Sequence, residues 1–166
     1  GVVLCGALER LINHYAVGPQ GELVVLAGND QAWMTAFTAA EVGLSVAAVV
    51  DLREAPDDAA FLAQANARGM TIHMGATVYT ARRSAESQSL SGVDIHRIDA
   101  QGEVGELIAQ HDCEVLAMSA GFMPAYQLAC QAGAKLDYDD DRAAFTLSGL
   151  PAGLLLAGSV NSTHSL

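Results

Sequence analysis

The segment from Leu23 to Asp51 constrains the fold more than any other part of the chain. Its letters, LVVLAGNDQAWMTAFTAAEVGLSVAAVVD, give an apolar run, a tight turn, a helical stretch, a glycine and a second apolar run. Uninterrupted apolar runs are typical of parallel strands that are covered on both faces. Gly43 stands where the end of a helix favours left-handed backbone. The segment therefore predicts a βαβ unit, the repeating element of a parallel sheet.

Later segments extend this unit into a larger sheet. A helix that Asp57 and Asp58 open leads into a strand at Thr71–His73, and the apolar run Cys113–Met118 returns to the parallel sheet. Between them, three strand-like segments joined by short polar turns predict an antiparallel meander. These segments are Thr77–Arg82, Ser89–Ile98 and Glu106–His111. The sequence thus predicts an α/β fold: a Rossmann-like parallel sheet with helices and a crossing antiparallel β-meander.

The two ends of the chain carry further predicted elements. Residues 4–16 have helical spacing. The last third predicts a short helix at Ala125–Ala132, strands at Lys135–Tyr138 and Ala144–Leu147 around an acidic turn, and a strand at Leu154–Ala157. We expect residues 1–125 to form an inserted NAD(P)-type domain and residues 126–166 to be the C-terminal tail of a neighbouring, incomplete dinucleotide-binding domain. Apolar segments at both ends lead us to expect a piece of a longer protein.

Composition excludes several classes of function. The net charge of -11 argues against a nucleic-acid partner. No apolar run reaches membrane-spanning length, and no basic segment opens a signal peptide. Three scattered cysteines without C-x-x-C spacing indicate a reducing compartment, so we expect the cytoplasm. The histidines lack metal-site spacing and no nucleophile elbow occurs, so we predict neither metal ligands nor catalytic residues.

The turn after the first strand of the βαβ unit lacks the usual phosphate-binding glycines. The three glycine positions fall at Ala27, Asn29 and Ala32, with Gly28 between the first two. The Asn29 side chain and the adjacent Asp30 carboxylate, a plausible helix N-cap, would crowd and repel a pyrophosphate. We favour a structural turn over one that holds a dinucleotide. If a dinucleotide does bind, its contacts would be Gly28, Asn29 and Ala32.

Asp51 ends the second strand of the unit. A carboxylate near this place commonly accepts hydrogen bonds from the adenine ribose hydroxyls, which favours NAD over NADP. Arg53 could pair with this carboxylate or approach a phosphate. The competing interpretation is a solvated loop acid.

Longer motifs carry a resemblance to known proteins. The chain contains GMTIHMGATV at 69–78, DCEVLAMSAGFMPA at 112–125 and LPAGLLLAGS at 150–159. In this order they resemble the second half of flavoproteins with two dinucleotide-binding domains, such as the pyridine nucleotide-disulphide reductases. Three more segments resemble the alpha subunit of heterotetrameric sarcosine oxidase. They are GVVLCGALERLINHYAVGPQG at 1–21, NDQAWMTAF at 29–37 and GFMPAYQLACQAGAKL at 121–136.

The resemblance implies a cofactor arrangement. Gly158 and Ser159 stand where flavin-binding relatives carry Gly-Asp, and serine cannot supply that charge. In the sarcosine oxidase group the corresponding domain is implied to hold NAD. FAD is implied in the beta subunit, and FMN at the alpha–beta interface. Any NAD site on this segment would be weak or absent.

The resemblance also implies an activity for the full complex. That activity is oxidative demethylation of sarcosine, a small amine, to glycine with folate and oxygen, in a hetero-oligomer of beta and other subunits. The segment itself would be inert and structural. Two alternatives stay open: the NAD(P)H-binding domain of a flavin-dependent pyridine nucleotide reductase, and a subunit-contact module of an opine-oxidising or cyanide-forming glycine-oxidising complex.

Overall fold

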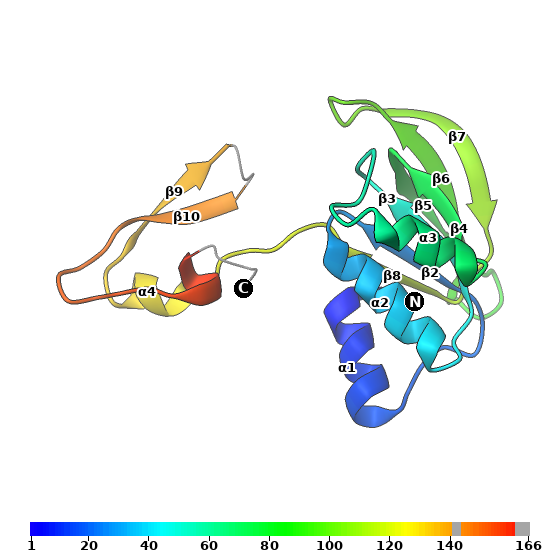
Figure 1. Cartoon of the computed structure of the whole chain (residues 1–166), viewed down its shortest axis with the longest axis horizontal. Coiled ribbons are helices and arrows are strands. Elements are labelled where there is room, and N and C mark those ends of the chain that lie inside the picture. Colours follow the sequence, from blue (N-terminus) through cyan, green and yellow to red (C-terminus); the bar gives the residue numbers. More distant parts are fainter. Residues whose placement is uncertain (141–143, 162–166) are drawn as a thin grey trace. The chain divides into compact units, whose positions relative to one another are not determined.

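The computed structural model describes residues 1–140 and 144–161, and the chain divides into two compact units (Figure 1). The first unit is Gly1–Ala120 and the second is Gly121–Leu166. The assignment of the second unit to a neighbouring dinucleotide-binding domain stays a prediction.

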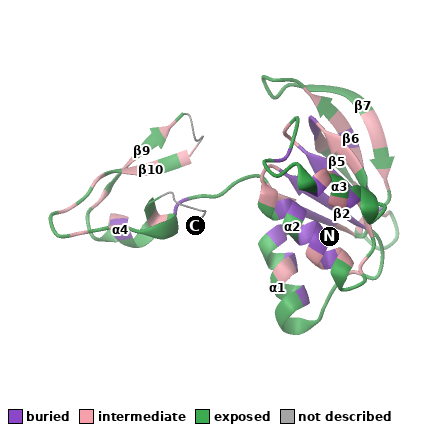
Figure 2. Ribbon diagram, viewed as in Figure 1, coloured by how far each residue is buried: buried purple, intermediate pink, exposed green. Residues whose placement is uncertain are grey.

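A five-stranded parallel sheet forms the centre of the first unit. Its order is β1 (Val2–Leu4), β8 (Val115–Ser119), β2 (Leu23–Ala27), β3 (Val46–Asp51) and β4 (Thr71–Met74). Every neighbouring pair is parallel. Strand β2 is buried along its whole length, as its uninterrupted apolar sequence predicts (Figure 2). The predicted α/β class with a parallel sheet is confirmed.

Helices cover one face of this sheet. They are α1 (Cys5–Tyr15), α2 (Asp30–Glu41) and α3 (Ala60–Ala67). Their apolar sides form one core with the sheet, in which Trp33, Phe37 and Phe61 make a triangle of rings with centroids 5.4–6.3 Å apart. Such aromatic pairs contribute about 0.5–1.5 kcal/mol each beyond the apolar area that they bury. These three rings fix α2 and α3 against each other.

The antiparallel meander covers the other face. Its strands are β5 (Ala76–Arg83), β6 (Leu90–Ile98) and β7 (Val104–His111), in the order β5-β6-β7. Val93 and Ile95 of β6 join the sheet residues Val24 and Val50 in a second buried cluster. Side chains alternate between the two faces of a strand, so β2 contributes to both cores. The predicted meander is confirmed.

The second unit is small and mostly exposed. It contains α4 (Gln127–Gln131), the antiparallel hairpin of β9 (Lys135–Asp139) and β10 (Ala144–Gly149), and a 3-10 turn at Gly158–Asn161. The predicted acidic turn includes Asp141, which lies outside the described residues. The predicted strand Leu154–Ala157 is wrong: these residues form no regular structure, and Leu155 is 93% exposed. An apolar run becomes a strand only where a neighbouring strand accepts its backbone hydrogen bonds.

Several element boundaries differ from the sequence prediction. Val2–Leu4 is an edge strand that pairs with β8, a partner too distant in sequence for local spacing to indicate. The residue that caps α2 is Asn29, not Asp30. Helix α3 begins at Ala60, not Asp57. None of the described helices combines the length and apolar character needed to cross a membrane.

Candidate functional site

The candidate site lies where the carboxyl ends of β2, β3 and β8 meet the beginning of α2. In open α/β sheets, ligands bind at this edge, in the crevice where the strand order reverses. Here the reversal falls between β2 and β8, because β3 and β4 follow β2 on one side and β8 and β1 lie on the other. Five of the predicted site residues, Gly28, Asn29, Ala32, Asp51 and Arg53, belong to this region.

Gly28 holds the turn against the end of β8. Its backbone N–H donates to the Ser119 carbonyl oxygen over 2.7 Å. A Cβ atom on Gly28 would lie 2.9 Å from the Ala120 carbonyl oxygen, closer than van der Waals contact allows. The need for glycine here is explained by packing between two chain segments.

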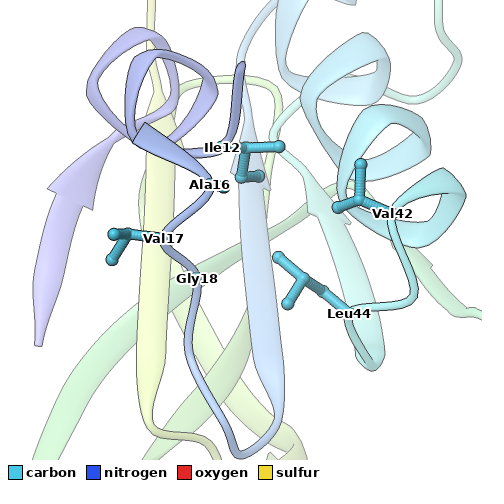
Figure 3. Close-up of a pocket in the computed structure, with 6 residues that line it drawn as sticks. All are labelled: Ile12, Ala16, Val17, Gly18, Val42 and Leu44. Carbon is cyan, nitrogen blue, oxygen red and sulfur yellow. The ribbon is translucent and has the colours of Figure 1, made fainter. Parts of the chain in front are cut away.

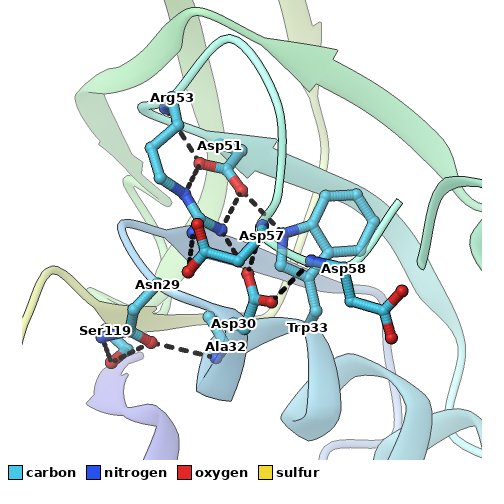
Figure 4. Close-up of polar contacts among 9 residues, drawn as sticks. All are labelled: Asn29, Asp30, Ala32, Trp33, Asp51, Arg53, Asp57, Asp58 and Ser119. Carbon is cyan, nitrogen blue, oxygen red and sulfur yellow. Dashed lines mark hydrogen bonds and ion pairs between the residues drawn. The ribbon is translucent and has the colours of Figure 1, made fainter. Parts of the chain in front are cut away.

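The Asn29 side chain fills the start of α2. It caps the helix with extended backbone, and its Oδ1 accepts from the Ala32 amide over 3.4 Å. Its Nδ2 donates to Ser119 Oγ over 3.0 Å, which links the turn after β2 to the end of β8 (Figure 4). In a phosphate-binding turn, amides at the helix N-terminus point at the ligand. Here the Asn29 side chain, and not a ligand, accepts the hydrogen bond of the Ala32 amide.

The Asp30 carboxylate organises the loop after β3. It accepts from the backbone amides of Asp57 and Asp58 over 3.1 and 3.0 Å, and from Arg53 Nη2 over 2.8 Å. Partial burial opposes ionisation of Asp30, but the hydrogen bonds from Arg53 and the two amides outweigh it and lower its pKa. At the first residue of α3, the Ala60 amide donates to Asp58 Oδ1 over 2.9 Å.

Asp51 is completely buried, so its interpretation as a solvated loop acid is wrong. Its Oδ2 accepts from Trp33 Nε1 over 2.7 Å and from Arg53 Nη2 over 2.9 Å. Its Oδ1 accepts from Arg53 Nε over 3.0 Å and from the Arg53 backbone amide over 2.9 Å. A carboxylate offers about four acceptor positions. All four are used within the protein.

Arg53 is therefore paired with carboxylates. It contacts Asp30 and Asp51, and its Nη1 lies 3.3 Å from the exposed Asp57. The hydrogen bond to Asp51 is the largest cause that raises the pKa of Arg53. One guanidinium thus faces three carboxylates, and this group contains no nucleophile–base pair.

Sequence reasoning missed Trp33 and Ser119 as members of this network. Trp33 follows Asp30 by three residues on α2, a spacing that places both on one side of a helix. Ser119 has no local signal, because only the sheet brings it beside Asn29. The predicted residues Gly158 and Ser159 lie in the second unit, where the Ser159 carbonyl accepts from the Ala125 amide over 3.2 Å.

Two other features of the described residues carry no chemistry for the site. A small apolar pocket of about 220 Å³ lies between the ends of α1 and α2 (Figure 3). It is lined by Ile12, Ala16, Val17, Gly18, Val42 and Leu44, none of which titrates. Within residues 1–140 and 144–161, no three or more His, Cys, Asp or Glu side chains gather as a metal site.

Comparison with solved structures shows the fold. Thioredoxin reductase from T. acidophilum matches with a TM-score of 0.59 at 15% identity, over 98% of this chain and 53% of that one. A FAD-dependent pyridine nucleotide-disulphide oxidoreductase from Desulfovibrio vulgaris matches with a TM-score of 0.57 at 20% identity, over 82% of this chain and 34% of that one. The likeness to these structures agrees with the predicted fold class.

Comparison of sequences shows the nearer relationship. No protein-family model matches the chain. The alpha subunit of sarcosine oxidase from Corynebacterium sp. strain U-96 is 31% identical over 96% of this chain, and that from Rhizobium meliloti strain 1021 is 30% identical over all of it. The chain spans only 16% and 15% of these relatives. Over the segment that it spans, the chain is similar to the sarcosine oxidase alpha subunits, as its motifs predict.

Proposed function

We propose that this chain is the part of a sarcosine-oxidase-type alpha subunit in which a dinucleotide-binding fold serves as scaffold. One observation carries the proposal. Two groups that would hold a dinucleotide, the Ala32 amide at the start of α2 and the Asp51 carboxylate, are bonded to the chain's own Asn29 and Arg53. The residues present therefore do not fit a tightly bound NAD.

Electrostatics add to this misfit. A pyrophosphate at the start of α2 would face the Asp30 carboxylate. Two unpaired unit charges 4 Å apart repel by about 4 kcal/mol at the effective dielectric of a protein surface, which is an upper limit here because Arg53 partly offsets the charge of Asp30. That is about half of the roughly 8 kcal/mol that a micromolar dissociation constant represents. A ribose hydroxyl at Asp51 would also have to displace Arg53 or Trp33, and a hydrogen bond to a charged group contributes about 1.5–3 kcal/mol.

The activity of the full complex extends the proposal. The names of the relatives support an oxidoreductase that acts on sarcosine. In the full complex, FAD and FMN would be held outside this segment, and folate would accept the one-carbon unit. The partners would be the beta and other subunits, with neither nucleic acid nor a membrane involved, and the complex would work in the cytoplasm. Neither unit contributes a catalytic residue under this proposal, so the segment alone is inert.

Calorimetric titration tests the scaffold assignment. NAD, NADH and NADPH are titrated separately into the chain and into the Asp51→Ala variant. We expect no binding by the unsubstituted chain at ligand concentrations up to about 1 mM, the limit of weak association. Micromolar binding that Asp51→Ala abolishes would overturn the scaffold assignment. A separate test mixes the chain with a sarcosine oxidase beta subunit, for which we expect co-elution.

The fold likeness to reductases favours one alternative, a domain that delivers NAD(P)H to a flavin. Micromolar binding of NADH or NADPH in the same titration would support this alternative. A domain that delivers NAD(P)H needs an open site for the ribose hydroxyls. The four hydrogen bonds that Asp51 already accepts argue against such a site.

A further inference from the structure

Two histidines that lie far apart in the sequence meet between the two sheets of the first unit. His73 belongs to β4, an edge strand of the parallel sheet, and His111 ends β7, an edge strand of the meander (Figure 1). Their Nε2 atoms lie 3.0 Å apart, and the ring planes are inclined by 67°. Both side chains are partly exposed, so water reaches the pair.

The distance between these nitrogens equals that of two imidazoles on one metal ion. Nitrogen ligands bind zinc at about 2.0–2.1 Å, so two of them at angles between 90° and the tetrahedral value lie about 2.8–3.4 Å apart. Imidazole nitrogen is a preferred ligand of zinc, nickel and copper. The ring centroids lie 5.2 Å apart, so the two Nε2 atoms point almost directly at each other, as in a hydrogen bond. To bind one ion, both rings would have to turn about their side-chain torsions and aim their lone pairs at a shared point, which is a change in the side chains and not in the strands.

The surroundings favour the neutral form of the His73 ring. Burial and the neighbouring His111 lower the pKa of His73, and a metal ion needs the neutral ring. The nearby cation, Arg82, donates to the His111 carbonyl oxygen but is matched by Asp94 and Asp112 at 3.2 and 3.0 Å. Its charge is therefore compensated next to the pair.

We propose that His73 and His111 form a two-histidine site for a divalent transition-metal ion, which would clamp the parallel sheet to the meander. The ion would replace the hydrogen bond between the two Nε2 atoms. Both rings would then be Nδ1–H tautomers, so the shared proton moves to Nδ1 of the donor ring and no net proton is released. Water would complete the coordination sphere.

Thermal unfolding in the presence of nickel tests this site. Trp33, the single tryptophan, lies in the same unit and reports its unfolding by fluorescence. A ligand at about one hundred times its Kd raises the folded-to-unfolded ratio about 100-fold. For a unit of this size, that is a rise in Tm of roughly 5–15 °C over the Tm in EDTA.

Variants assign the effect to the pair. We expect His73→Gln and His111→Gln each to lose the nickel-dependent rise in Tm. The matched control is His96→Gln on β6, because His96 contacts Tyr79 and the Gly105 carbonyl instead of a second histidine. The nickel-dependent rise in Tm should remain in this variant. Each shift is referred to the same variant's Tm in EDTA, so a destabilised variant does not imitate a loss of binding.

A second measurement needs no substitution. Substoichiometric Cu²⁺ should broaden the ring signals of His73 and His111 in the NMR spectrum while those of His96 stay sharp. Equal broadening of all three rings, no nickel-dependent rise in the unsubstituted chain, or a rise that both His73→Gln and His111→Gln retain would each overturn the proposal.

Discussion

Removal of the Arg53 guanidinium gives the most direct test of the site network. Arg53→Gln eliminates two of the four hydrogen bonds to the Asp51 carboxylate, those from Nε and Nη2, so that only neutral donors remain. Asp51 has no exposed surface through which water could replace them. Trp33 and one backbone amide then face a full negative charge.

The expected cost follows from this burial. Breaking a buried ion pair by removing one partner destabilises a protein by about 3–5 kcal/mol, because the remaining charge is uncompensated. Total stabilities are commonly about 5–15 kcal/mol, so the variant should remain folded but weakly stable. With a urea m-value of about 1–3 kcal/mol/M, the midpoint should fall by roughly 2 M. Trp33 fluorescence follows the transition directly, since its indole N–H is bonded to Asp51.

Two controls separate the network from a general loss of charge. Arg83→Gln removes an exposed guanidinium from β5 and should change stability by less than about 0.5 kcal/mol. The double variant Asp51→Asn, Arg53→Gln should be more stable than Arg53→Gln alone, because no buried charge is left unpaired. An Arg53→Gln cost equal to that of Arg83→Gln would refute the reasoning.

Three further predictions concern single features of the first unit. Gly28→Ala should lower stability by about 1–3 kcal/mol in thermal unfolding, because its Cβ would contact the Ala120 carbonyl, whereas Gly6→Ala in the open first turn of α1 should not destabilise. The lowered pKa of Asp30 gives stability that is present above its ordinary value of 3.8 and lost as pH falls through the lower folded pKa. An acid titration of the Asp30→Asn variant should show a smaller loss over that window, and an unchanged profile would contradict it. Burial raises the pKa of Cys5 to about 11, so its thiol should resist a disulfide reagent at pH 8 in the native chain but react in urea.

Local sequence was sufficient for the main elements of the first unit. The apolar runs at β2 and β3, the helical stretch between them and Gly43 fix a βαβ unit, since strand and helix periodicities are properties of neighbouring residues. The same reasoning located the meander. It failed at Val2–Leu4, a strand of three residues that exists only because β8 pairs with it, and at Leu154–Ala157, which has no pairing strand among the described residues.

The sequence by itself determined which residues surround the dinucleotide-type site and that its turn lacks the usual glycines. Only the tertiary structure decided what fills the site. Whether Asp51 faces solvent, a ribose or an arginine depends on its burial and on the path of the loop after β3. Asp30 holds that loop by accepting hydrogen bonds from the backbone amides of Asp57 and Asp58. The meeting of His73 and His111 was likewise invisible to spacing, because it arises from the stacking of two sheets. Periodicity reports local conformation, whereas contacts between segments distant in sequence depend on the packing of the whole unit.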